Sequence, residues 1–166
     1  MRAKMSFKVA QVNIALPKAP VESPLLADFM ALLDPINAIA DASDGFVWRL
    51  QTDEGNATSI RPFEDERLMV NLSTWESVEA LREFVYRSVH VGSCAGAASG
   101  SSTCACTWRC GGVPAGHVPS VEEAKGRLAH LREHGPTPHA FTFREPFGPP
   151  DGTAAPLVDD ELGCPA

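Results

Sequence analysis

The chain has 166 residues, of which 44% are hydrophobic and 21% charged, and this suits one globular domain with a core of its own. The formal net charge of −7 argues against nucleic acid and anionic membranes as partners, since both attract clustered lysine and arginine. No apolar run reaches the ~20 residues of a membrane span, and no signal-peptide core follows Met1, so we expect a cytoplasmic protein.

The first part of the chain predicts a strand followed by helix. Residues 7–16 alternate between apolar and other side chains with the period of two that is typical of a strand. Ser23 before Pro24 predicts a helix N-cap followed by proline at the first helical position. Asp34 before Pro35 repeats this signal within the same apolar pattern, which predicts either a second short helix or a kink.

Two further strands are predicted at residues 45–51 and 67–72, with a turn at residues 53–56 after the first of them. Capping boxes at 73–76 and 120–123 then predict the starts of two later helices.

The second of these helices should end at Gly135 before Pro136, and residues 140–143 predict a short final strand. The predicted fold is therefore α+β and ferredoxin-like, βαββαβ with an extra C-terminal helix and strand. We expect residues 1–6 to be a disordered N-terminus, 7–147 a single domain, and 148–166 a disordered acidic and proline-rich tail.

Residues 91–112 differ from their surroundings, because they are rich in Gly, Ala, Ser and Cys and have no apolar periodicity. The segment lies where the second helix of the domain should continue and where a fourth strand is needed. Four of the five cysteines lie in it, but their spacing, C-x9-C-x-C-x3-C, matches no common zinc pattern. We therefore predict no metal site.

Several segments resemble a known family, among them AQVNIA, DPINAIADASDGFVWRLQTDEGNAT and LMVNLSTWESVEALREFVYRSVH. They are similar to domain-of-unknown-function family 3291, and the resemblance covers roughly residues 7 to 147 except for 91 to 112. That family is grouped with the dimeric α+β barrels, which include antibiotic-biosynthesis monooxygenases. The resemblance thus implies a homodimer whose subunits together form such a barrel.

The same resemblance suggests an origin for the anomalous segment. In relatives this stretch resembles an arginine-rich helix end followed by a strand that ends Leu-Trp-Trp. One permitted reading of the codons in a shifted frame is LRRRREWFEHMRVYMALWW, which runs directly into Val113. We predict that residues 91–112 are a frameshifted segment; the alternative is a real Cys/Gly-rich loop.

The strand pattern predicts one wholly apolar sheet face, suited to the helices, and one polar face. The polar face collects Gln11, Asn13, Arg49, Gln51, Asn71 and Ser73 among apolar neighbours. Two interpretations stay open for it. It is either a solvated face or the interior of a two-subunit barrel, lined by the few polar groups that ligand sites usually have.

Further candidates come from the helix that follows and from the family. Tyr86 and His90 share one helix face and are able to orient a substrate or move a proton, or else are solvated or interface residues. Asn71 and Trp75 lie where the predicted strand at residues 67–72 passes into the next helix. In the similar monooxygenases an Asn and a Trp near this junction hold an aromatic substrate. The alternative role for Trp75 is that of a core anchor. The candidate pocket is Asn13, Trp48, Arg49, Asn71, Trp75, Tyr86 and His90.

We therefore expect an uncharacterised small-molecule-binding or dimerisation domain of the dimeric α+β barrel type, with no assigned reaction. The alternative is a cofactor-free, monooxygenase-like enzyme acting on an aromatic small molecule; a third is that the frameshift leaves this chain without function. We predict no cofactor. Haem is the minor alternative. It is suggested by the haem-degrading relatives, which combine an Asn, a Trp and a His that Asn13, Trp75 and His90 loosely match. The expected partners are a second copy of the chain and a small aromatic ligand.

Overall fold

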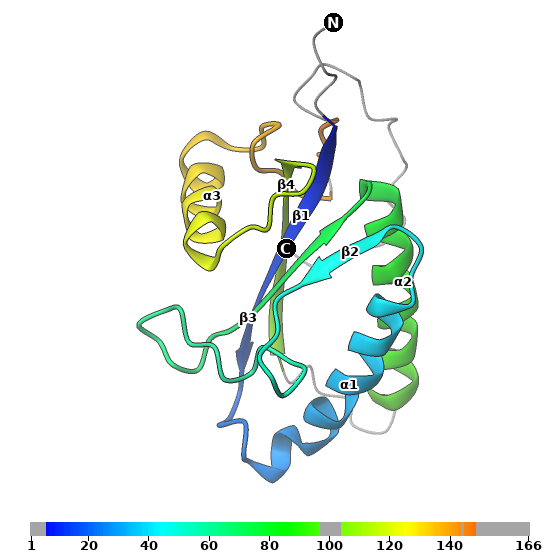
Figure 1. Cartoon of the computed structure of the whole chain (residues 1–166). Helices are drawn as coiled ribbons and strands as arrows, with labels where there is room; N and C mark the ends of the chain where they lie inside the picture. Colours follow the sequence, from blue (N-terminus) through cyan, green and yellow to red (C-terminus); the bar gives the residue numbers. More distant parts are fainter. Residues whose placement is uncertain (1–5, 97–103, 144, 149–166) are drawn as a thin grey trace, which may run out of the picture.

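The computed structural model describes residues 6–96, 104–143 and 145–148, with the side chains of 88–96 and 104–109 outside that description. Its helices and strands follow the order β, α, β, β, α, β, α (Figure 1). They are β1 (Phe7–Pro17), the 3-10 helix η1 (Pro24–Leu26), α1 (Ala27–Asp41), β2 (Phe46–Arg49), β3 (Met69–Trp75), α2 (Val78–Gly96), β4 (Cys104–Pro114) and α3 (Val121–His134).

The strands form one sheet in the order β2-β3-β1-β4, in which every neighbouring pair is antiparallel. β1 is central; its residue Asn13 lies opposite Asn71 of β3, and Gln11 lies opposite Ser73. This order, with α1 and α2 as the two connections, is that of a ferredoxin-like βαββαβ domain. The predicted α+β class and ferredoxin-like topology are confirmed.

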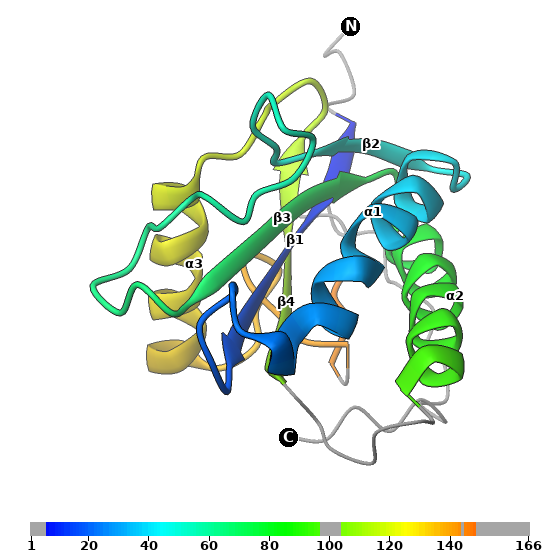
Figure 2. The same ribbon diagram turned by 90° about the horizontal axis from the view of Figure 1, so that it is seen from below.

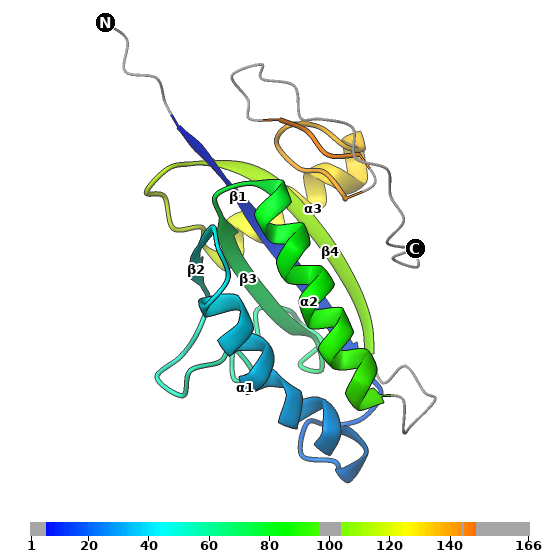
Figure 3. The ribbon, with the colours of Figure 1, turned by 90° about the vertical axis from the view of Figure 1, so that its right-hand side faces the viewer.

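The sheet is covered by helices on both faces. α1 and α2 pack side by side on one face, and α3 lies on the opposite face (Figures 2 and 3). The core beneath α1 and α2 is centred on Trp75, which is fully buried. Its ring lies 4.9 Å from that of Phe84, in a stacked arrangement, and 5.3 Å edge-on from that of Phe46.

The second core lies beneath α3 and shows that the predicted assignment of the sheet faces was wrong. Val12 of β1 and Leu72 of β3 pack there against Ala124 and Leu128 of α3. The apolar sheet face thus meets the extra helix α3, whereas the polar face meets α1 and α2. Period-two alternation separates two faces but does not say which helix covers each, because that depends on chain connections outside the strands.

The helix ends follow local signals, with one exception. Ser120 caps α3, since its Oγ accepts from the Glu123 backbone N–H at 3.1 Å, and Gly135 with φ +73° ends that helix. The capping box predicted at residues 73–76 was wrong, because residues 73–75 complete β3. Instead Ser77 lies at the start of α2, where its Oγ accepts from the Ala80 N–H at 3.2 Å.

α1 is one continuous helix with Pro35 inside it, rather than two helices. The predicted final strand is reduced to isolated bridges. One of them joins Phe141 to Cys110 of β4, and the two backbones exchange hydrogen bonds of 2.9 and 2.8 Å. The disordered ends were predicted at residues 1–6 and 148–166. All of these residues except Ser6 and Gly148 lie outside the described residues, so the prediction stays open. The frameshift stays a prediction, which sequencing the gene across this segment tests.

Candidate ligand-binding pocket

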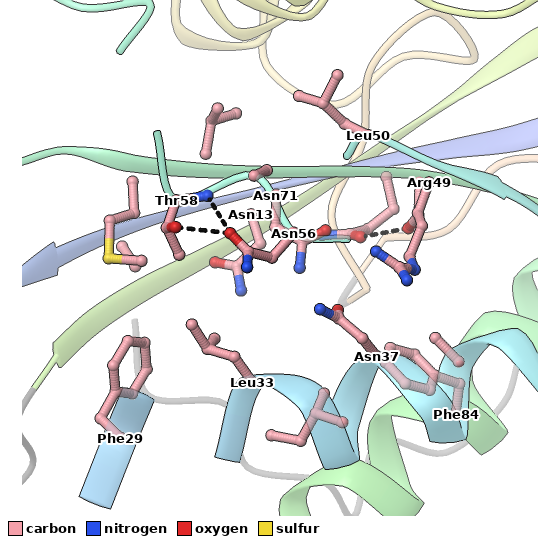
Figure 4. Close-up of a pocket in the computed structure, with 18 of the residues that line it drawn as sticks. Asn13, Phe29, Leu33, Asn37, Arg49, Leu50, Asn56, Thr58, Asn71 and Phe84 are labelled. Carbon is pink, nitrogen blue, oxygen red and sulfur yellow. Dashed lines mark hydrogen bonds between the residues drawn. The ribbon is translucent and has the colours of Figure 1, made fainter. Parts of the chain in front are cut away.

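A cavity of about 340 Å³ lies between the sheet and α1 (Figure 4). Volumes of roughly 300–1,000 Å³ are typical of small-molecule sites. β1 and β3 form one wall and α1 the opposite one, where Phe29, Leu33 and Ile36 present their apolar side chains. The loop after β2 closes a third side with Ala57 and its neighbours. The cavity is therefore a mainly apolar slot between a sheet and a helix.

Polar groups enter this slot in two rows from the sheet. Gln11 and Asn13 are two residues apart on β1, and their partners across β3 are Ser73 and Asn71. Side chains two apart on a strand point to the same face, so all four side chains face α1. Asn37 adds an amide from α1 on the other side of the cavity (Figure 4).

A chain of buried hydrogen bonds connects three of the lining residues. The Trp75 Nε1–H donates to Ser73 Oγ at 2.9 Å, and the Ser73 hydroxyl donates to Gln11 Oε1 at 2.8 Å. These side chains are almost completely enclosed, with Gln11 only 2% exposed. Among the residues that the structure describes, neither Gln11 Nε2 nor Asn13 Oδ1 has a hydrogen-bond partner. Buried polar atoms nearly always have one, so these two atoms are exceptions within the pocket lining.

Arg49 lines the pocket but is committed to the protein. Its Nε and one terminal nitrogen donate to the Asp41 carboxylate at 2.8 and 3.0 Å, and its other terminal nitrogen donates to the Gly55 carbonyl at 2.7 Å. The hydrogen bonds and charge of Arg49 hold the pKa of Asp41 below its usual range, although partial burial opposes this. Arg49 thus ties the end of α1 to the loop that closes the pocket.

That loop is also fastened from within. Asn56 Oδ1 accepts from the backbone N–H and the hydroxyl of Thr58, at 3.0 and 2.6 Å (Figure 4). Both residues line the pocket. The part of the loop that lines the pocket is therefore held by hydrogen bonds from the side chains of Arg49 and Asn56.

Four of the seven predicted site residues lie together in this pocket: Asn13, Arg49, Asn71 and Trp75. Trp48 instead packs on the opposite sheet face, against the core beneath α3. Tyr86 is 59% exposed on α2 and does not line the pocket. The side chain of His90, on which the haem alternative depends, lies outside the described residues.

Gln11 and Asn37 are among the pocket residues that were missing from the predicted set. Gln11 was placed on the polar sheet face but was not made a candidate, although it has the same parity on β1 as Asn13. Asn37 is a lone amide four residues after Leu33 on the apolar face of α1. A polar residue at helical spacing within an apolar stripe was the available signal.

Two kinds of feature are absent from the part of the chain that the structure describes. No group of three or more His, Cys, Asp or Glu residues there is arranged to hold a metal ion. No described helix is both long and apolar enough to cross a membrane.

The fold and the pocket together define a ferredoxin-like α+β domain with a ligand-sized cavity under α1. Residues 8–156 match the family described as Domain of unknown function (DUF3291), and the chain belongs to that family. The predicted family is thereby confirmed. No curated protein matches the chain.

Two solved structures show weaker similarity. The cofactor-independent oxygenase SnoaB of Streptomyces nogalater is 17% identical over 67% of this chain and 95% of its own, with a TM-score of 0.41. Protein NE2512 of Nitrosomonas europaea, of unknown function, is 16% identical over 70% of this chain and 99% of its own, with a TM-score of 0.42.

Proposed function

We propose that this protein binds a small, flat, mainly apolar molecule in the pocket between the sheet and α1. The observation that carries the proposal is the presence of unpartnered buried amide atoms, on Gln11 and Asn13, in an otherwise apolar cavity of about 340 Å³. Ligand sites usually combine apolar walls with a few fixed polar groups in this way.

The shape of the cavity supports a flat ligand. The apolar side chains of α1 face the amide rows of the sheet, so a ring system inserted between them contacts both walls. The aromatic rings of Phe29 and Phe84 lie at separate places along the α1 side of the cavity (Figure 4). Aromatic side chains favour stacked and edge-on contacts with other rings.

Blocking the pocket tests the proposal. The probe is 9-fluorenone, a rigid tricyclic ketone, titrated into the full chain by isothermal calorimetry. Ala57→Phe places a ring into the cavity from the loop wall and should weaken binding at least tenfold. Ala31→Phe is the matched control, since Ala31 is an exposed residue of α1 that does not line the pocket. Equal binding by wild type and Ala57→Phe would refute the assignment of the pocket.

A second candidate is cofactor-independent oxygenation of an aromatic ligand bound in the same pocket. It is favoured by Asn71 and Trp75, the two residue types that the similar monooxygenases use, which here line one cavity. The substrate itself would supply the electrons to O2. Oxygen uptake with a hydroquinone-type aromatic, abolished in Trp75→Phe while the fold persists, is the expected result; no uptake across an aromatic panel contradicts it.

We also propose that the chain forms the homodimer that its family resemblance implies. The match of residues 8–156 to that family supports this proposal. Light scattering should give twice the mass of the chain, and a monomer at micromolar concentration would contradict the proposal.

A further inference from the structure

The direction of the hydrogen bonds behind the pocket is fixed by the chemistry of Trp75. An indole N–H is only a donor, so Ser73 Oγ must accept the hydrogen bond of 2.9 Å that joins them. The Ser73 hydroxyl then has its own hydrogen to donate, and Gln11 Oε1 lies 2.8 Å away to accept it. Each hydrogen bond in this series is therefore donated in the direction from Trp75 to Gln11.

This polarity determines which atom Gln11 turns to the ligand. With Oε1 bound to Ser73, the Nε2 amide group is left without a partner among the described residues. If the Gln11 amide were reversed, Nε2 would lie against Ser73 Oγ. The buried Ser73 hydroxyl hydrogen would then have no acceptor among the described residues. The observed orientation satisfies both partners, so the pocket presents an N–H donor at Gln11.

The donor lies at the enclosed end of the cavity. Gln11, Ser73 and Trp75 are 2%, 4% and 0% exposed, whereas Asn71, which lines the same cavity, is exposed. A ligand that enters past Asn71 thus meets Gln11 with the edge that enters first, which is called its leading edge below. A hydrogen bond in such a desolvated place discriminates between ligands, because a leading edge that cannot accept leaves the amide unpaired.

The charges around the pocket restrict the acceptor to a neutral one. Arg49 is the cationic side chain in the lining, and Asp41 already neutralises it with two hydrogen bonds. A carboxylate or phenolate next to Gln11 would therefore be buried without a counter-charge, which costs far more than one amide hydrogen bond returns. A ketone-type or quinone-type oxygen has the required polarity without charge.

We propose that Gln11 is the residue that selects the ligand, and that the ligand class is a flat apolar ring system with a neutral carbonyl oxygen at its leading edge. This inference rests on the proposed small-molecule function and adds the polarity of the ligand to it. Asn13 Oδ1, two residues along β1, offers an acceptor for a hydroxyl on the same ligand.

A panel of ligands with nearly the same shape tests the inference on the unmodified protein. 9-Fluorenone, fluorene and carbazole differ at one ring position, which is respectively an acceptor, a methylene and an N–H donor. Fluorenone should bind about tenfold more tightly than fluorene, because one buried hydrogen bond changes affinity by about this factor. Carbazole should bind no more tightly than fluorene, and fluorene-9-carboxylate should bind most weakly.

Two variants assign this preference to the proposed atoms. Gln11→Met keeps the length of the side chain but removes the donor, and should make the affinities for fluorenone and fluorene equal. Ser73→Ala removes the anchor that fixes the amide, so carbazole should gain affinity relative to fluorenone. A merely structural role of Ser73 would weaken all ligands alike. Gln51→Met is the matched control at an exposed position outside the pocket and should leave the preference unchanged.

The outcomes separate this inference from the function on which it rests. If fluorenone and fluorene bind wild type equally, or carbazole binds best, the assignment of Gln11 as a donor is overturned while the pocket stands. If none of the three binds, the proposed function fails and the inference fails with it. A preference for fluorenone that survives in Gln11→Met also overturns the role of Gln11.

Discussion

Gly45 connects α1 to β2 in a conformation that few other residues adopt. Its φ is +78°, in the left-handed region, and a Cβ built on it would lie 2.6 Å from the Cβ of Ala80 in α2. The Gly45 carbonyl also accepts the backbone N–H of Glu76 at 2.7 Å, which fixes the start of α2 beside this turn. The absence of a side chain at Gly45 thus allows α1, β2 and α2 to meet closely.

Replacing this glycine should therefore destabilise the protein. We expect Gly45→Ala to lower the free energy of unfolding by about 2–3 kcal/mol, from the left-handed backbone and the contact with α2 together. Gly126→Ala is the matched control, because Gly126 lies inside α3 with open space around its Cα. It should raise the free energy of unfolding by about 0.5–1 kcal/mol. Urea denaturation measures both, and two changes of the same sign would contradict this account.

At the scale of elements, Arg49 joins three parts of the chain. It belongs to β2, pairs with the last residue of α1, and bonds to the carbonyl of Gly55 in the loop beyond β2. Its side chain is only 11% exposed, while that of Asp41 is 49% exposed. The pair therefore holds one wall of the pocket to another.

The Asp41→Asn variant should show this in its pH dependence. Because the folded-state pKa of Asp41 is lowered, its contribution is fully present above the unfolded value of 3.8 and is lost as the pH falls through the folded value. At pH 7 the variant should be less stable by about 1 kcal/mol, a value kept small because solvent screens the half-exposed carboxylate. At a pH below the lowered folded value, its denaturation curve should coincide with that of wild type.

Asp65→Asn provides the control for this measurement. Arg67 also lowers the pKa of Asp65, but the pair lies on the surface and joins residues of the same turn. No measurable change in unfolding is expected for this variant at either pH. An equal loss in both variants would show that the connection between α1 and β2 has no special role.

Elements governed by local chemistry were predictable from the sequence. The cap at Ser120 and the stop at Gly135 were predicted correctly, since each depends on a few neighbouring residues. Ser73 was misassigned as a cap because a serine with an acidic residue three positions later satisfies the same local rule. Only the pairing of β3 with β1 shows that the strand continues to Trp75.

Predicting the pocket required knowing how elements pack together, which short stretches of sequence do not reveal. The parity of β1 correctly placed Asn13 and Gln11 on one face with Asn71 and Ser73. The covering of that face by α1, and hence the contribution of Asn37, depends on how α1 packs across the sheet. A cavity is a volume left between packed elements, so strand alternation alone does not predict it.

For the molecule as a whole, α3 and the chain after it form a second layer with its own response to pH. His139 lies with its ring 4.9 Å from that of His130, and its carbonyl accepts from Arg127 at 2.7 Å. Burial, then the positive charge of Arg127 and the neighbouring His130, lowers the pKa of His139, and Glu123 opposes this. Protonation of His139 is therefore less favourable in the folded than in the unfolded chain.

We expect this layer to weaken in mild acid. As the pH falls below the unfolded value of 6.5, the unfolded chain takes up a proton at His139 first, so stability declines until the lowered folded value is passed. His139→Gln should therefore lose less stability than wild type between pH 7.5 and about 5. Thermal unfolding across this range provides the measurement, and parallel curves for the two proteins would contradict the prediction.

The two faces of β1 also limit how the pocket is able to change. Gln11 and Asn13 face the ligand cavity, and their neighbours Ala10 and Val12 face α3. Inserting or deleting one residue in this strand would exchange the two sets, moving amides into the apolar layer and valine into the cavity. Ligand preference is therefore free to change by substitution at alternate positions, whereas changes of length are confined to the loops that surround the sheet.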